Sequence, residues 1–337
     1  MAALPDRPAA AGASRGRVPD FFVVGHAKSG TTALYEMLKE HPQIFLSDVK
    51  EPQFFARNPA PAEPRANGAV QRFELTGRHE ETLDDYLSLF AGAAADQVAG
   101  DASTFYLWSP VAAARIAQAQ PAARIIAILR EPASFVRSLH LQMLQNNTET
   151  EKSLRRALEL ESSRREGRDI PENAHWPAAL IYTDRVRYVE QLQRFEERFG
   201  ADQLLVLIYD DFLADNAATL RRVQRFIGVA ERDPVARVRA NPTVGVRSVR
   251  LYTATRDVRA GRGTPARLVR AAGKAVTTRG LRKRVLYPLR RRIVYTEPQA
   301  PDPELMAELR ERFRGEVEAL SAHLGRDLVR EWHYDRA

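Results

Sequence analysis

The sequence predicts a three-layer α/β fold, in which a central parallel sheet is flanked by helices. Two short apolar runs, Phe21–Val24 and Ile125–Leu129, each pass through a turn into a segment whose apolar residues have helical spacing. A third apolar run, Leu204–Ile208, follows a helix expected over Thr183–Phe199. Strands that alternate with helices are typical of parallel sheets, and strands that are apolar throughout indicate a sheet covered on both faces.

The same patterns predict the other elements. A short strand is expected at Gln97–Ala102, and Glu149–Arg168 is expected to form a charged, largely exposed helix. Asp210 and Asp211 are expected to cap the helix that follows the Leu204–Ile208 strand, with a catalytic role as the alternative. Further helices are predicted at Leu83–Phe90, Val111–Gln118, Leu220–Ile227 and Pro303–Leu324.

Length and composition favour one domain of ordinary size. The chain has 337 residues, of which 44% are hydrophobic, and it has no cysteine. Residues 1–18 are rich in Ala, Pro and Arg and are expected to be a disordered lead, with one domain over 19–337. Since no apolar run approaches the ~20 residues that span a bilayer, and the lead does not resemble a signal peptide, we expect a cytoplasmic protein.

The turn after Phe21–Val24 has the features of an anion site. It reads GHAKSGTT and leads into a helix, whose first N–H groups lack intrahelical acceptors and can bind a phosphate or sulfate. Its glycines have the spacing of a Walker loop, but Thr31 stands where the Walker lysine would be. The lysine is Lys28 instead. The expected fold is therefore P-loop-like, with an anion bound by Lys28, Ser29, Gly30, Thr31 and Thr32.

This displaced lysine resembles the phosphosulfate loop of sulfotransferases that use 3′-phosphoadenosine-5′-phosphosulfate (PAPS). A second resemblance lies at Arg130, which ends the Ile125–Leu129 strand and precedes Ser138 by eight residues. In that family such a pair holds the 3′-phosphate of the nucleotide. A guanidinium suits this task because it offers two parallel donors to one phosphate. The resemblance implies PAPS as co-substrate, 3′-phosphoadenosine-5′-phosphate (PAP) as product, and no metal requirement.

A third resemblance lies in KEPQFF, Lys50–Phe55, which is similar to a segment of carbohydrate sulfotransferases of the heparan sulfate type and of bacterial relatives. It implies Glu51 as the catalytic base, with Lys28 balancing charge on the leaving phosphate. Gln53 stands where the eukaryotic motif commonly has histidine. Other sulfotransferases use a histidine base, and the nearby alternatives here are His26, His41 and His140.

The acceptor is expected to be a hydroxyl on a small molecule or carbohydrate, such as a glycan, a glycolipid or a natural-product alcohol. Ser103, Thr104, Tyr106 and Trp108 follow the Gln97–Ala102 strand and either belong to the core or stack on a sugar. Asn58–Gly77 is a candidate lid over the acceptor. Two alternative functions stay open: a P-loop kinase, and a noncatalytic protein that binds a nucleotide or polyanion.

Residues 247–292 form a strongly basic segment, with fifteen Lys or Arg and a single acid, Asp257. The segment carries +14 and the whole chain +8, so the remainder carries −6. The resemblance implies that Arg247 helps to close this region over the nucleotide. Alternatively the charge holds an anionic acceptor, contacts a membrane surface through 264–295, or is simply solvated. Nucleic acid is not expected, because no recognised binding motif accompanies the charge.

Overall fold

The computed structural model describes residues 16–56, 82–174, 176–234, 245–246, 295–296 and 300–336. Five parallel strands form the central sheet in the order β2-β3-β1-β4-β5. They are β1 (Phe21–Val23), β2 (Ile44–Leu46), β3 (Val98–Ala102), β4 (Arg124–Leu129) and β5 (Leu204–Ile208). The longest pairing joins β4 to β5, with Ile125 opposite Leu204 and Leu129 opposite Ile208.

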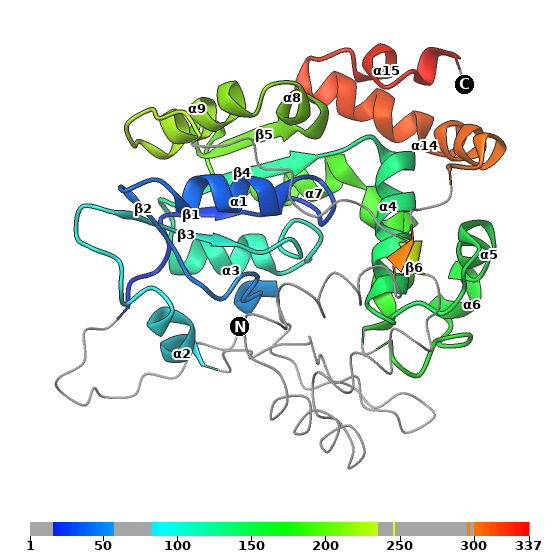
Figure 1. Ribbon diagram of the computed structural model, residues 1–337, viewed down its shortest axis with the longest axis horizontal. Coiled ribbons are helices and arrows are strands. Elements are labelled where there is room, and N and C mark those ends of the chain that lie inside the picture. The colour runs from blue at the N-terminus through cyan, green and yellow to red at the C-terminus, as the bar shows by residue number, and fades with distance from the viewer. Residues whose placement is uncertain are drawn as a thin grey trace, which may run out of the picture.

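Helices connect these strands and cover the sheet (Figure 1). The α-helices are α1 (Thr31–Lys39), α2 (Leu83–Ser88), α3 (Ala112–Ala119), α4 (Pro132–Gln145), α5 (Leu154–Glu159), α6 (Glu161–Arg165), α7 (Tyr188–Glu196), α8 (Tyr209–Ala214), α9 (Asn216–Ile227), α14 (Pro303–Leu324) and α15 (Leu328–Glu331). Short 3₁₀ turns lie at Phe54–Ala56, Pro177–Leu180, Thr183–Val186, Ala201–Gln203 and Tyr334–Arg336.

Alternate strand residues enter two separate hydrophobic clusters, one on each face of the sheet. Phe21 and Val23 pack with side chains of α1 and α9, whereas Phe22 and Val24 pack with side chains of α3, α4, α7 and α14. Successive strand residues point to opposite faces, so a sheet covered on both faces needs apolar residues at every position. The three-layer parallel fold predicted from the sequence is thus confirmed.

The C-terminal helices complete one side of the molecule. In Figure 1, α14 and α15 (orange to red) lie close to α8 and β5. Asp210 accepts a hydrogen bond from Trp332 Nε1 at 2.9 Å, and Asp211 pairs with Arg326. The expectation that these acids cap the next helix is therefore wrong. They lie in the first turn of α8, and the cap of α9 is Asp215.

The expected exposed helix at 149–168 is also wrong. The segment forms two shorter helices, α5 and α6, and part of its charge is internal. Glu149 is fully buried and pairs with Arg164, which is 4% exposed, through bonds of 2.7 and 2.9 Å. Tyr182 donates a further hydrogen bond to Glu149. A run of charged residues in the sequence does not reveal that opposite charges neutralise each other inside the fold.

Strands β6 (Gly245–Val246) and β7 (Tyr295–Thr296) pair antiparallel. The paired residues flank the basic segment in the sequence, one strand before it and one after it. The segment itself, 247–292, lies outside the described residues, as do most of the stretch expected to contact a membrane and the candidate lid. Among the helices that are described, none combines the length and apolar character needed to cross a bilayer.

Candidate active site

The candidate residues come together because the sheet is parallel. All five strands end at the same edge, and each is followed by a candidate site segment. The loop with Lys28 follows β1, the turn with Glu51 follows β2, Thr104 follows β3, Arg130 follows β4 and Tyr209 follows β5. The carboxyl edge of an open parallel sheet is where ligands bind in such folds.

The loop between β1 and α1 is shaped to hold an anion. Gly30 is the N-cap of α1 with φ 88°, and no side chain caps the helix, so the first N–H groups of α1 remain open to a ligand. Ser29 is fully buried, and its Oγ has no hydrogen-bond partner in the part of the chain that the structure describes. At Gly25, a Cβ atom would lie 2.5–2.7 Å from atoms of Ile128, so only glycine fits. These features suit a phosphate or sulfate group.

Cationic side chains gather around Lys28 of this loop. Arg130 Nη1 donates to the Lys28 carbonyl at 2.9 Å, and its guanidinium lies 5.0 Å from the centre of the Tyr209 ring. Burial, and then the nearby charge of Arg130, lower the pKa of Lys28. Burial and Arg130 likewise lower the pKa of Arg137. Cations gathered in this way destabilise each other until an anion binds between them.

Two further residues, Ser138 and Arg247, are expected to hold the nucleotide. Ser138 lies in the second turn of α4, the helix that begins just after Arg130, and is buried. Its role in holding the 3′-phosphate stays a prediction. Arg247 lies outside the described residues.

Glu51 is held tightly but remains accessible. Lys50 Nζ donates to its Oε1 at 2.9 Å, while Gln53 Nε2 and Thr104 Oγ1 donate to its Oε2 at 3.2 and 3.0 Å. Its side chain is 27% exposed. Its backbone has φ 59°, a left-handed conformation that is rare outside glycine and asparagine and marks a constrained turn.

Lys50 joins this carboxylate to the anion loop. Its Nζ also donates to Thr32 Oγ1 at 2.9 Å, so one ammonium group bridges the first turn of α1 and Glu51. Lys50 was not predicted to belong to the site. Its position next to the expected base is the only signal for it in the sequence.

The three histidines that could replace Glu51 have structural partners. His26 Nε2 bonds Gln191 Oε1 at 2.7 Å, His41 Nε2 bonds the Ala230 carbonyl, and His140 Nε2 bonds the Glu151 carbonyl. Burial, reinforced by the charge of Arg185, holds the pKa of His26 well below its usual value. His26 is therefore neutral at pH 7.

Arg185 was not selected from the sequence, but its surroundings are unusual for an arginine. It is 1% exposed, and among the described residues neither its Nε nor its Nη1 has a hydrogen-bond partner. Its guanidinium lies 4.4 Å from the ring centre of Trp108 and 5.0 Å from that of Phe105. Burial lowers its pKa to about 9, although the charges of Tyr188 and Glu51 act in the opposite direction. Trp176 packs on both rings.

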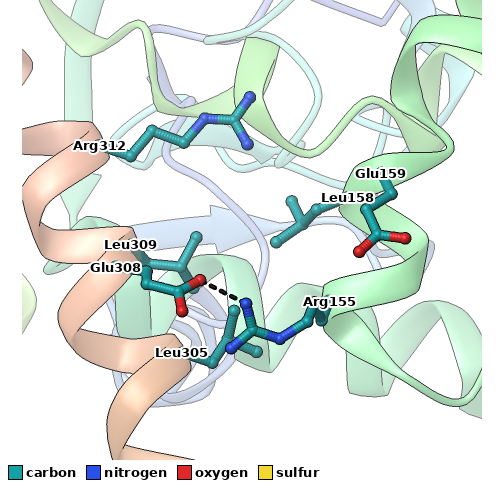
Figure 2. A pocket seen from close by; sticks show the side chains of 7 residues that line it. All are labelled: Arg155, Leu158, Glu159, Leu305, Glu308, Leu309 and Arg312. Atoms are coloured by element: carbon teal, nitrogen blue, oxygen red, sulfur yellow. Dashed lines mark hydrogen bonds and ion pairs between the residues drawn. The ribbon is translucent and has the colours of Figure 1, made fainter.

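A separate pocket of about 210 Å³ lies between α5 and α14 (Figure 2). Its floor includes Leu158, Leu305 and Leu309, and an ion pair between Arg155 and Glu308 crosses it at 2.5 Å. None of its lining residues belongs to the candidate site. The pocket is a gap at the contact of two amphipathic helices.

Comparison with known proteins agrees with this geometry. Residues 19–234, which include Lys28, Glu51 and Arg130, match the sulfotransferase family. The chain belongs to this family. This sulfotransferase is 27% identical over 220 residues to bifunctional heparan sulfate N-deacetylase/N-sulfotransferase 4 of Mus musculus, an alignment of 63% of the chain and 22% of the relative. It is also 27% identical over 225 residues to human heparan sulfate glucosamine 3-O-sulfotransferase 6, an alignment of 67% of the chain and 56% of the relative.

A solved structure supports the fold over nearly the whole length. The sulfotransferase from Alicyclobacillus acidocaldarius superposes with a TM-score of 0.64 at 24% identity, covering 94% of this chain and 99% of that one. The P-loop-like fold expected from the sequence is therefore confirmed. Since the chain spans 22% and 56% of the two curated relatives, their substrates do not transfer to it directly.

Proposed function

We propose that this sulfotransferase moves the sulfuryl group of PAPS to an acceptor hydroxyl, with Glu51 as the base. Membership of the family supports sulfate transfer. The observation that supports the detailed proposal best is the Lys50 bridge, because it joins the Glu51 carboxylate to Thr32 at the start of the anion loop. A base and an anion site that are linked by one side chain can act on the same reacting centre.

On the donor side, PAPS would supply an activated sulfuryl group. The open N–H groups of α1, with Ser29, Thr31 and Thr32, would hold its 5′-phosphosulfate. Lys28 would balance the negative charge that grows on the leaving phosphate oxygen. Arg130 and Ser138 would hold the 3′-phosphate, and Arg247 would close over it.

On the acceptor side, Glu51 would accept the hydroxyl proton as the oxygen attacks sulfur. The new O–S bond forms while the bond from sulfur to the phosphate oxygen breaks, and PAP leaves with that oxygen. Arg185 is held against Trp108 and Phe105 and would face the acceptor. Its Nε and Nη1 groups, which have no partner among the described residues, would donate hydrogen bonds to the acceptor. The acceptor class is proposed to be a hydroxyl of a small molecule or carbohydrate, as the names of the curated relatives suggest.

We also propose that 19–337 act as one domain, although the family match ends at residue 234. Support comes from α14, whose buried residues Leu305, Leu309, Phe313 and Val317 belong to the same hydrophobic cluster as α4 and α7. The C-terminal part therefore contributes to the core that carries the site.

Thermal shift with nucleotides tests the proposal against a P-loop kinase. PAP without magnesium should raise the melting temperature by several degrees, because a ligand at 100 times its Kd stabilises the fold by about 2.7 kcal/mol. ATP with magnesium should not match it, because Thr31 occupies the Walker lysine position. Adenosine 5′-monophosphate controls for the 3′-phosphate. Equal stabilisation by PAP and the monophosphate, or a larger effect of ATP with magnesium, would contradict the proposal.

A further inference from the structure

Asp101, at the end of β3, is a buried carboxylate that serves three hydroxyl groups. Ser103 Oγ donates to its Oδ1 at 2.7 Å, and Tyr86 and Tyr106 donate to its Oδ2 at 2.8 and 2.7 Å. Asp101 is 2% exposed, and the side chains of the three donors are fully buried. Because all three donate to it, the carboxylate fixes the direction of each O–H bond.

Two of these hydroxyls reach the turn that carries Glu51. Ser103 Oγ accepts a hydrogen bond from the backbone N–H of Gln53 at 3.1 Å, and Tyr106 OH accepts one from the N–H of Phe55 at 3.4 Å. These amides lie two and four residues after Glu51. Both Glu51 and Gln53 have left-handed backbones, with φ of 59° and 56°, so the turn needs external restraint to keep this shape.

We propose that Asp101 is a positioning residue for the catalytic base. Its carboxylate directs the Ser103 and Tyr106 hydroxyls so that their oxygens accept from Gln53 and Phe55, which holds Glu51 in place. The inference rests on the proposed role of Glu51. A protonated Asp101, or an asparagine there, must itself donate to one hydroxyl. If that hydroxyl belongs to Ser103 or Tyr106, it loses the acceptor for its own hydrogen, and its lone pairs turn away from the loop amide.

The titratable groups that face Asp101 are Tyr86 from α2, Tyr106, and Glu51 from the turn after β2. Burial raises the pKa of Asp101 to about 6, the hydroxyl donors oppose this rise, and the charge of Glu51 adds to it. Since the folded pKa exceeds the unfolded value near 3.8, ionisation costs stability as the pH rises from about 4 to 6. The same ionisation fixes the direction of the O–H bonds of Ser103 and Tyr106. Stability should therefore fall between about pH 4 and 6, and turnover should rise around pH 6.

Amide hydrogen exchange measures the restraint without any catalytic assay. In Asp101→Asn, the amides of Gln53 and Phe55 should exchange about tenfold faster, whereas those of α1 should not change. The melting temperature at pH 7.5 should be no lower than that of the parent, and the Kd for PAP should stay within about twofold. Unchanged exchange in 51–56, or parallel losses of stability and PAP affinity, would overturn the proposal in favour of a purely structural role.

The turnover test uses PAPS with water as acceptor, followed by release of PAP between pH 5 and 8. In the parent, turnover should fall as the pH drops below about 6; this fall is the acid limb of the profile. Asp101→Asn should lack the acid limb, and its turnover at pH 7.5 should be about 10- to 100-fold lower than that of the parent. An acid limb retained in the variant would contradict the inference. A parent that consumes no PAPS would contradict the proposed function, while the exchange result would still test the restraint.

Tyr86 and Tyr106 provide a matched pair of variants. Tyr86→Phe and Tyr106→Phe each remove one hydrogen bond to Asp101 Oδ2, but only the Tyr106 hydroxyl contacts the loop. Tyr86→Phe should shift the acid limb to higher pH, with normal exchange of Phe55 at pH 8. Tyr106→Phe should speed exchange of Phe55 at every pH. Identical behaviour of the two variants would overturn the proposal.

Discussion

Lys28 and Arg130 lie together at the carboxyl edge of the sheet, and within the described residues no carboxylate forms an ion pair with either. Arg130 instead donates to the Lys28 carbonyl and stacks on Tyr209. Partly buried cations without a counter-ion are costly to maintain. An anionic ligand would remove that cost, which explains why such a cluster stands beside the open end of α1.

Removing Arg130 and removing Lys28 should affect different properties of the enzyme. Arg130→Ala should weaken PAP binding by about 1.5 to 3 kcal/mol, as expected for hydrogen bonds to a charged group, whereas Lys28→Ala should mainly lower turnover. Titration calorimetry with PAP, together with steady-state rates, separates these effects. Lys39→Ala, at the far end of α1, is the control and should change neither. Equal effects of the two site variants on affinity and rate would refute the division of roles.

Arg185 and Arg164 form a natural comparison, since both are arginines with almost no exposed surface. Arg164 is paired with Glu149, so Arg164→Met should destabilise the fold by about 3 to 5 kcal/mol by leaving that acid alone. No acid within the described ranges pairs with Arg185, so Arg185→Met should keep or raise the free energy of unfolding while turnover falls. Denaturant unfolding and rate measurements on both variants distinguish a structural role from a functional one. Strong destabilisation by Arg185→Met would assign Arg185 a structural role.

The elements that the sequence predicted best are long or strongly apolar. Residues 204–208 and 303–324 match β5 and α14 to the residue. Strand β2 was missed because three residues, Ile44–Leu46, are too few to show a pattern. The helix expected over 183–199 begins with a 3₁₀ turn at 183–186, and regular α7 follows only from Tyr188.

The close packing of the anion loop on β4 gives a prediction for Gly25. Its added Cβ would meet the Ile128 backbone at 2.6–2.7 Å, and backbone in the sheet centre cannot move aside. Gly25→Ala should therefore lower the free energy of unfolding by about 1 to 3 kcal/mol or more. It should also weaken PAP binding. Chemical denaturation measures the loss. The control, Gly315→Ala, lies on the exposed face of α14 with free space around its Cβ, and should stabilise by about 0.5 to 1 kcal/mol. A neutral Gly25→Ala would contradict the close packing.

For the whole molecule, the sequence could predict which segments contribute to the site but not how they connect. Lys28, Glu51 and Arg130 stand in motifs that can be read along the chain, and the parallel sheet brings these motifs to one edge. Lys50 and Asp101 act through partners far away in sequence, such as Thr32 and Tyr86. Contacts of that kind depend on the three-dimensional arrangement, and residue type alone does not reveal them.

The basic segment 247–292 carries a net charge of +14, and the two strands that flank it in the sequence, β6 and β7, pair with each other. If it recruits an anionic acceptor or a membrane, neutralising Arg282, Lys283 and Arg284 should raise the apparent acceptor constant and flatten its salt dependence. Charges more than about 8 to 10 Å apart are screened at ordinary ionic strength. PAP affinity should barely change. A fall in PAP affinity with an unchanged acceptor constant would instead indicate closure over the nucleotide.

The most direct measurement of the central claim is transfer of labelled sulfur from PAPS, without magnesium, by the parent and by Glu51→Gln. A panel of hydroxylated acceptors, with water as the default acceptor, is followed by label transfer and PAP release. The account predicts turnover by the parent, and a loss of about 10² to 10⁴ in Glu51→Gln with PAP affinity nearly unchanged. Failure of the parent to bind or consume PAPS, or a Glu51→Gln rate within a fewfold of the parent, would contradict it.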